Sequence, residues 1–264
     1  MKKSFLIIFS FFISISSFSQ KDSIVNYLDK SYHKIAKERA TYIQTIVKKD
    51  TLWLATVYFG NGKMKLQGHF KNKNLKTKTG LFKTFNDKGN LKTTQVYNSE
   101  GKKDGKYNYY SNNGKVMTVG TFQNGKEVGE WIYLDENLTR RAQIIFKDGK
   151  VLNHNLWDDQ GSEIKEELVL LKVPEYNEGS RKLRIKLKNE LIRDLRKKGL
   201  KTNFLLKCEI GKEGNVQNIS IVPKLESKYE EQIITYFANL KGFQPGIIAN
   251  MKVVYPLELP FILK

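Results

Sequence analysis

Short runs of alternating hydrophobic and polar residues fill most of the chain, and Gly, Asn and Asp separate them. Between residues 55 and 161 an aromatic residue stands four places before a Gly or Asn, and this spacing occurs five times in phase. The five pairs are Tyr58 with Gly62, Phe85 with Gly89, Tyr110 with Gly114, Tyr133 with Asn137, and Trp157 with Gly161. The second members follow one another at intervals of 23 to 27 residues, which indicates one supersecondary unit repeated along the chain.

A second aromatic series lies half a period away, at Phe70, Tyr97, Phe122 and Phe146. Asn-Gly and Asp-Gly pairs between the runs supply the positive φ that tight hairpin turns need, and aromatic and β-branched residues suit a half-buried sheet. Each unit is therefore predicted to be a β-hairpin, and the hairpins to form an antiparallel meander with aromatic rows along one face. We interpret these aromatics as packing residues rather than ligand-binding residues.

The ends of the repeat region differ from its middle. The hairpin of residues 70–80 is expected to be irregular, because Asn74 stands where other units have glycine. Residues 41–47 and 51–59 are predicted to form a capping hairpin around a turn at Lys48, Lys49 and Asp50. For residues 27–38 the pattern leaves a short helix and an edge segment open.

After residue 165 the pattern changes from repeats to a mixture of helix and strand. Leucines at every fourth position predict one amphipathic helix over residues 181–198, which Gly199 would end. The helix either packs on a sheet as a surface helix or contacts an anionic membrane with its basic face. A strand at 204–210, a turn at 211–215, a strand at 216–222, a helix at 229–240 and a single closing strand at 251–263 are predicted to follow.

Two stretches of the repeat region resemble MORN repeats of the bacterial variant. They are residues 97–107 (YNSEGKKDGKY) and 122–131 (FQNGKEVGEW). The resemblance covers about residues 55–161 and implies a meander of MORN-like hairpins.

The C-terminal region resembles the C-terminal domain of TonB energy transducers, in its Bacteroidetes-type version, over about residues 174–264. The residues that carry this are 206–222 (LKCEIGKEGNVQNISIV), 241–246 (KGFQPG) and 253–261 (VVYPLELPF). The resemblance implies a small sheet packed with two helices, which binds a partner's extended segment at a sheet edge. By that analogy the partner-binding edge strand contains Met251, Val253, Val254, Tyr255 and Leu257. The implied partner is a segment of an envelope protein such as a TonB-dependent receptor, and a homodimer is an alternative.

The first residues indicate export. Lys2 and Lys3 precede an apolar run from Phe5 to Phe18 that four serines interrupt, and this is the pattern of a signal peptide. We expect a signal peptide at 1–19, N-terminal capping strands at 20–54, the repeat meander at 55–165 and the TonB-like domain at 166–264. The mature chain would be periplasmic or secreted. With only five prolines the chain has no proline-rich spacer, so the sequence relates the chain to TonB-dependent transport but leaves open whether it takes part in energy transduction.

The formal charge of the chain is +19, and residues 55–150 alone hold 18 Lys and Arg against 8 Asp and Glu. The excess either reflects a solvated lysine-rich surface or attracts anionic polysaccharide or lipid. Nucleic acid is not expected as a partner, since export removes it and no recognition module is present.

Catalytic patterns are absent from the sequence. His33, His69 and His154 lie far apart without metal-ligand spacing, and no nucleophile motif occurs. Cys208, the only cysteine, lies in an apolar strand pattern and is expected to be buried and inert. We therefore expect no enzyme, no cofactor and no metal. The fold class is mainly β with a C-terminal α+β domain, and the function is that of an envelope binding protein. The alternative is a structural scaffold whose repeat face binds anionic polysaccharide or lipid.

Overall fold

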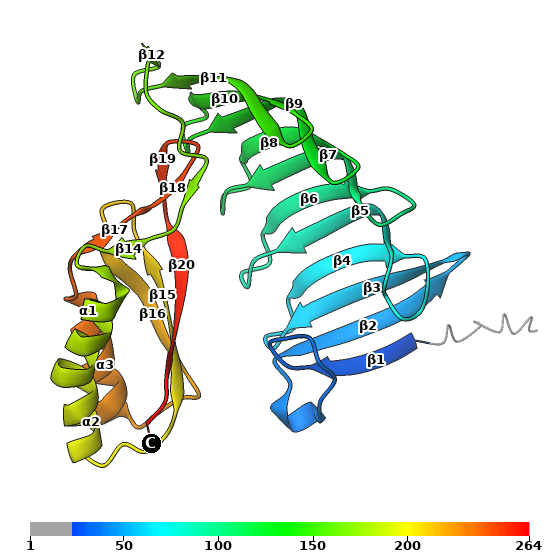
Figure 1. Cartoon of the computed structure of the whole chain (residues 1–264). Coiled ribbons are helices and arrows are strands. Elements are labelled where there is room, and N and C mark those ends of the chain that lie inside the picture. Colours follow the sequence, from blue (N-terminus) through cyan, green and yellow to red (C-terminus); the bar gives the residue numbers. More distant parts are fainter. Residues whose placement is uncertain (1–22, 264) are drawn as a thin grey trace, which may run out of the picture. The chain divides into compact units, whose positions relative to one another are not determined.

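The computed structural model describes residues 23–263, so the predicted signal peptide lies outside the described residues (Figure 1). As predicted, the fold is mainly β and includes a long antiparallel meander of 12 strands in chain order. The strands are β1 (Ser23–Leu28), β2 (Tyr42–Lys49), β3 (Leu52–Phe59), β4 (Met64–Phe70), β5 (Lys78–Phe85), β6 (Leu91–Tyr97), β7 (Lys103–Tyr110), β8 (Val116–Gln123), β9 (Lys126–Leu134), β10 (Arg140–Lys147), β11 (Lys150–Trp157) and β12 (Glu163–Ile164).

The chain divides into two compact units within this sheet. One unit runs up to Leu91 and includes Val96–Lys102, and the other consists of Lys92–Gln95 with the chain from Lys103 onward. In the first unit the ring of Phe82 lies against Gly68, where an added Cβ would come within 2.4 Å of it. Phe70 and Tyr97 meet the same ring edge-on, with centroid distances of 5.2 and 4.9 Å. A glycine on one strand therefore makes room for an aromatic ring from the next.

The meander strands of the second unit repeat this arrangement around Trp131. An added Cβ on Gly120 would lie 2.1 Å from the indole. Tyr107 stacks on the indole at 5.5 Å, and Phe122 and Phe146 meet it edge-on at 5.1 and 5.9 Å. The predicted packing of aromatic residues on one face of the meander is confirmed. The opposite face carries polar pairs such as Asn108 and Thr94, whose side chains are hydrogen-bonded at 3.0 Å.

One turn of the first aromatic series differs from the other four, in which the glycine of the pair has the positive φ. In the fourth unit Leu138, and not Asn137, has the positive φ, 67°, and its N–H donates to the carbonyl of Asp135 at 3.0 Å. The carboxylate of Asp135 accepts from the amides of Asn137 and Thr139 at 2.9 and 3.0 Å. This Asx turn fixes where the turn starts, so the exposed Leu138 takes the left-handed position that glycine occupies in the other units.

The N-terminal segment is an edge strand. Residues 23–28 form β1, paired with β2, and the chain then continues through a short 3-10 helix, η1 (Lys37–Arg39). The predicted hairpin of β2 and β3 forms, but it does not end the sheet, because β1 lies outside β2 as the edge strand. β2 also extends to Lys49, so the turn is shorter than predicted. The hairpin of β4 and β5 is irregular as expected, because Leu75 has a positive φ and the register shifts between Gln67 and His69.

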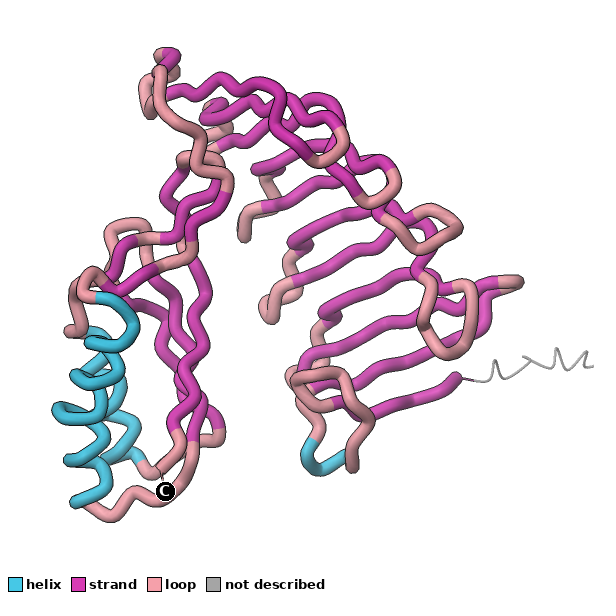
Figure 2. Tube along the Cα trace, viewed as in Figure 1, coloured by secondary structure: helices cyan, strands magenta, loops and turns pink. Residues whose placement is uncertain are grey.

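The C-terminal part is built from short strands and two helical segments, and every helix of the described residues except η1 lies there (Figure 2). Three small sheets have the orders β13-β18-β19, β14-β17 and β16-β15-β20. The elements are β13 (Leu171–Lys172), β14 (Glu175–Tyr176), α1 (Gly179–Leu187), η2 (Lys188–Ile192), α2 (Arg193–Lys197), β15 (Phe204–Ile210), β16 (Val216–Val222), α3 (Ser227–Ala238), β17 (Phe243–Gln244), β18 (Gly246–Ile248), β19 (Met251–Val253) and β20 (Tyr255–Phe261).

Two C-terminal predictions need correction. The predicted helix is continuous from Gly179 to Lys197, and Gly199 ends it with a φ of 95°, but its middle, η2, is a π-helix. The predicted single closing strand is two strands, β19 and β20, that pair with different neighbours on either side of Val254. The chain changes partner strand there because β18 is too short to accompany β20.

Candidate functional site

The predicted partner-binding residues lie along the segment that forms β19 and β20. Met251 and Val253 in β19 pair with Ile248 and Gly246, whereas Tyr255 and Leu257 in β20 pair with Ile210 and Cys208. Val254, between the strands, is 41% exposed. From Met251 to Ile262, partly buried or buried and exposed residues alternate without interruption, although the paired strand changes.

Proline positions reveal the direction of the backbone groups along this segment. Pro256 and Pro260 pair with Glu209 and Leu205, yet proline has no N–H to donate to β15. In an antiparallel ladder only alternate pairs exchange hydrogen bonds. The odd-numbered residues of β20 therefore bond to β15, and the even-numbered residues direct their backbone groups away from it.

The same alternation holds in β19. Ile248 and Met251 flank a two-residue turn and so form a hydrogen-bonded pair, which leaves the N–H of Lys252 on the free side. The free edge thus offers donors at Lys252, Val254 and Glu258, with Pro256 breaking the series. Among residues 23–263 no strand pairs with this side of β19 or β20. The prolines also limit uncontrolled pairing along the rest of the edge.

The turn between β18 and β19 fixes one end of this segment. Ala249 and Asn250 have φ of 48° and 59°, as a tight hairpin turn requires. Ala249 is 1% exposed and packs in the core of the last meander strands, with Leu156 and Ile164. The side chain of Asn250 accepts from the amide of Val169 at 2.6 Å and donates to the carbonyl of Glu167 at 3.0 Å. The edge therefore begins at a firmly held point.

A second free edge was missed from the sequence. In the order β16-β15-β20, β16 also has an unpaired side within the described residues, and it contains no proline. Its pairs with β15 direct the amides of Ile219 and Ile221 outward. The absence of proline from residues 216–222 can be read from the sequence. It indicates a free edge only once the strand order shows that β16 is an edge strand.

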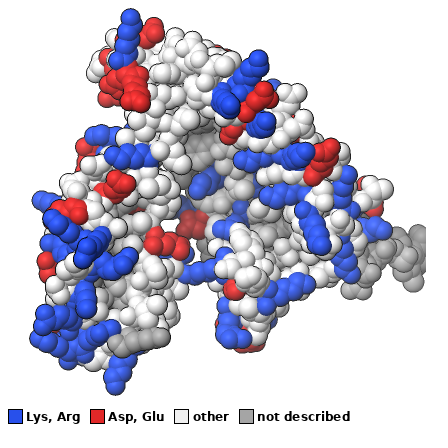
Figure 3. Space-filling view, in the orientation of Figure 1, with Lys and Arg blue, Asp and Glu red and all other residues white. Residues whose placement is uncertain are grey.

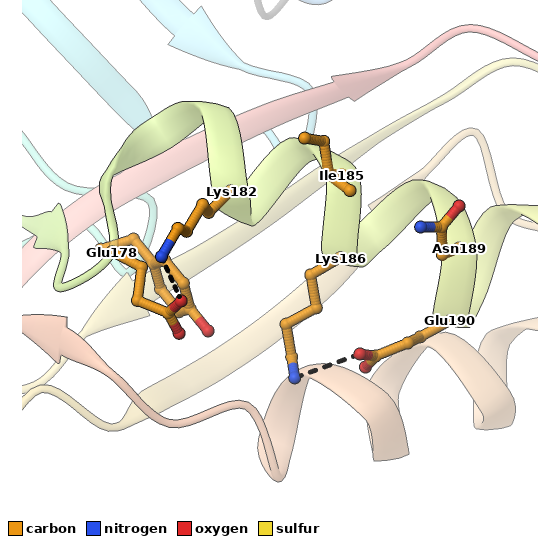
Figure 4. Close-up of a pocket in the computed structure, with 7 residues that line it drawn as sticks. Glu178, Lys182, Ile185, Lys186, Asn189 and Glu190 are labelled. Atoms are coloured by element: carbon orange, nitrogen blue, oxygen red, sulfur yellow. Dashed lines mark hydrogen bonds and ion pairs between the residues drawn. The ribbon is translucent and has the colours of Figure 1, made fainter.

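Two open pockets in the described part of the chain show no arrangement of catalytic groups. One, of about 340 Å³, is open and lies along the helix between Tyr176 and Glu190 (Figure 4). Its charges are paired, Lys182 with Glu178 and Lys186 with Glu190, each at 3.2 Å. A hydrogen bond from Tyr236 lowers the pKa of Glu190. The other, of about 270 Å³, contains Arg141, whose guanidinium pairs with Asp159. The charged side chains named here form ion pairs with one another, and we assign these pairs a structural role.

The remaining candidates for chemistry are dispersed or buried. No group of three or more His, Cys, Asp or Glu side chains that could hold a metal occurs in the part of the chain that the structure describes. Cys208 is buried, as predicted, and desolvation raises the pKa of its thiol to about 11. The thiol therefore stays protonated and unreactive near neutral pH.

Part of the lysine excess serves the meander itself. Lys63 donates to the carbonyl of Lys88 at 2.8 Å, and Lys115 donates to that of Glu136 at 3.0 Å. Each lysine therefore links its own hairpin turn to the next turn on the same edge of the meander. Lys78 and Lys103 lie over aromatic rings, at 4.8 Å from Tyr97 and 4.4 Å from Phe122. Within residues 23–263 no helix is long and apolar enough to cross a membrane.

Tyrosine burial on the aromatic face is expected to make the protein less stable at alkaline pH. Burial, with Glu127 nearby, raises the pKa of Tyr133 to about 12 from 10.0. The folded state thus favours the neutral phenol, and this stability is complete below pH 10 and lost as pH rises toward 12. We expect Tyr133→Phe to make the denaturation midpoint fall less steeply across this range than in the wild type. Equal slopes for the two proteins would show that this phenol does not control the loss.

No protein-family model matches the chain, and no curated protein matches it significantly, so its function has to be inferred from its own residues.

Proposed function

We propose that the chain is an exported adaptor protein of the cell envelope whose C-terminal module binds an extended segment of a partner protein as an added strand. The observation that carries this proposal is the edge from Lys252 to Glu258, along which alternate residues are exposed and no strand of the described residues is paired. Backbone hydrogen bonds would supply the affinity, and alternate side chains the selectivity. The protein would act by binding and not as an enzyme.

The resemblance to TonB C-terminal domains supports the same function. It implies a segment of a TonB-dependent receptor as the partner, with a second copy of this chain as the alternative. Two outward donors, Lys252 and Val254, stand together before Pro256. We therefore place the centre of the docking site at these residues, and expect a short partner segment with little pairing beyond Glu258.

Val254→Pro is expected to abolish partner capture while the protein stays folded. The substitution removes an outward donor that has no partner strand in the described residues, and the extended backbone there suits proline and its preceding residue. The experiment is a pulldown of envelope proteins by the full mature chain at about 1 M salt, where the screening length of about 3 Å suppresses charge-driven binding.

Val253→Pro is the matched control, because it introduces the same residue one position away. Val253 pairs with Gly246 in β18, so this variant loses an internal hydrogen bond and is expected to be destabilised by about 1–3 kcal/mol, the usual cost of an unsatisfied hydrogen-bonding group. If folded Val254→Pro still captures the same proteins with unchanged affinity, the docking edge is wrong. Capture that disappears for all variants at high salt would favour the scaffold function of the repeat face.

A further inference from the structure

The helix from Gly179 to Lys197 has three sides with different roles. One side is apolar and buried, and its residues are Leu183, Leu187, Leu191 and Leu195. A second side holds every acidic residue of the helix and its N-cap, each paired with a lysine one turn away: Glu178 with Lys182, Glu190 with Lys186, and Asp194 with Lys198. The third side is exposed and basic.

The π-helix explains how these sides stay separate along the whole helix. Leucines spaced four residues apart drift by roughly 40° per step around an α-helix, so Leu195 would leave the core. The wider turn of η2 inserts one extra residue and sets the following side chains back by roughly 100°. Leu195 is consequently 0% exposed.

The same shift aligns basic residues from both halves of the helix. Arg193, Arg196 and Lys197 after the π-helix come onto the side of Arg181 and Arg184 before it and of Lys188 at its start. All six are exposed, and in the described part of the chain none of them forms a direct ion pair, although Lys197 is close enough to Asp194 to help Lys198 lower the pKa of that carboxyl. We call these six residues the basic stripe. At 1.5 Å per residue it is about 24 Å long.

Figure 3 shows Lys and Arg gathered over this helix. An apolar residue, Ile185, which is 50% exposed, lies beside the basic stripe. Ile185 also lines the pocket on this helix, together with Lys182, Lys186 and Glu190, so it lies between the basic stripe and the paired side (Figure 4). The pocket on this helix is lined by paired charges and not by the free arginines, so no groove with free cations accompanies the stripe.

We propose that the basic stripe docks the protein on a bilayer surface of anionic phospholipids. Four of its six cations are arginines, whose guanidinium groups pair with phosphate in two parallel hydrogen bonds. A straight ridge suits a plane of headgroups, and Ile185 can contact the boundary between headgroups and acyl chains. The leucines are buried in the domain core, so the contact is electrostatic and peripheral, without insertion of the helix. This inference does not depend on the strand edge.

The test measures sedimentation of the full mature chain with phosphatidylcholine vesicles, with and without phosphatidylglycerol. Binding is expected only with phosphatidylglycerol, and it should weaken as salt rises from about 0.1 M to about 1 M and the screening length falls from about 10 Å to about 3 Å. The stripe variant combines Arg181→Gln, Arg184→Gln and Lys188→Gln. Its binding should weaken about 100-fold, at roughly fivefold per cation.

The matched control removes the same charge from the paired side of the helix, with Lys182→Gln, Lys186→Gln and Lys198→Gln. Its binding should change no more than a few-fold. An equal loss in both variants would mean that net charge alone attracts the protein, and no loss in the stripe variant would mean that the stripe is not the contact. Either result overturns the proposal.

A soluble polyanion distinguishes the other class of ligand. Ile185→Ser should weaken vesicle binding a few-fold and leave binding to dextran sulfate unchanged. If the wild type binds dextran sulfate through the stripe but does not bind phosphatidylglycerol vesicles, the stripe serves a linear polyanion and the membrane proposal is wrong.

Discussion

Trp131→Ala is expected to lower the free energy of unfolding by about 3–5 kcal/mol, the usual cost of truncating a buried tryptophan. The indole is 5% exposed and is enclosed by rings from three neighbouring strands and by the Gly120 backbone. Its Nε1–H also donates to the carbonyl of Thr121 at 3.3 Å. Denaturant unfolding of the full mature chain, followed by circular dichroism, would measure the change.

Trp157→Ala is the control for this experiment. Trp157 is only partly buried, and its ring is covered by the guanidinium of Arg140 at 5.5 Å. We expect a smaller loss, of about 1–2 kcal/mol, because less apolar surface is exposed by the truncation. If both variants lose the same stability, Trp131 is not the centre of a packed row, and a ligand-binding role for it becomes the better interpretation.

The meander could be predicted because its information is local and repeated. Aromatic residues, turn residues and alternating runs recur at intervals of 23 to 27 residues, so each of the five units independently predicts a hairpin. The exception at Leu138 is also local in origin. Asp135 starts the turn through its side chain, and the sequence spacing of Tyr133 and Asn137 imitated the pattern of the other units.

Only some of the C-terminal elements could be predicted: the short strands β13, β14, β17 and β18 were not expected from the sequence, and neither was the strand pairing. Strands β15 and β16 begin and end as expected, because alternation and the Gly211–Asn215 turn mark them. The division of the closing segment at Val254 depends on its partner strands, β18 before this residue and β15 after it. The residues around Val254 do not encode this pairing. The π-helix likewise forms because leucines at four-residue spacing all pack on one sheet. No residue within η2 would have predicted it.

The candidate edge shows how one residue type can change a functional interpretation. The resemblance to TonB C-terminal domains implied a docking edge along the apolar segment of residues 251–257. The strand pairing then gives Pro256 and Pro260 an orientation, because neither can donate to β15. They face the free side, so the available edge is shorter than this segment and is concentrated at Lys252 and Val254.

Gly214→Ala is expected to destabilise the protein by about 2–5 kcal/mol, from a left-handed backbone cost of roughly 1–2 and an overpacking cost of roughly 1–3. Gly214 lies in the turn between β15 and β16 with a φ of 78°. An added Cβ would come 2.0 Å from the carbonyl oxygen of Phe243. Backbone cannot move aside as a flexible side chain does, so β17 and the ring contact between Phe243 and Tyr176 at 5.4 Å would shift.

Gly114→Ala separates these two costs, because Gly114 has nearly the same φ, 77°, but nothing within 4 Å of an added Cβ. This variant should lose only the backbone cost of about 1–2 kcal/mol. Thermal and denaturant unfolding of both variants, with hydrogen exchange at Asn177, whose amide donates to the carbonyl of Gly242 at 2.6 Å, would measure the difference. Faster exchange is expected in Gly214→Ala alone. Equal destabilisation in the two variants, with unchanged exchange, would contradict this prediction. It would mean that β17 moves without a loss of free energy and that the turn does not support the β14–β17 pair.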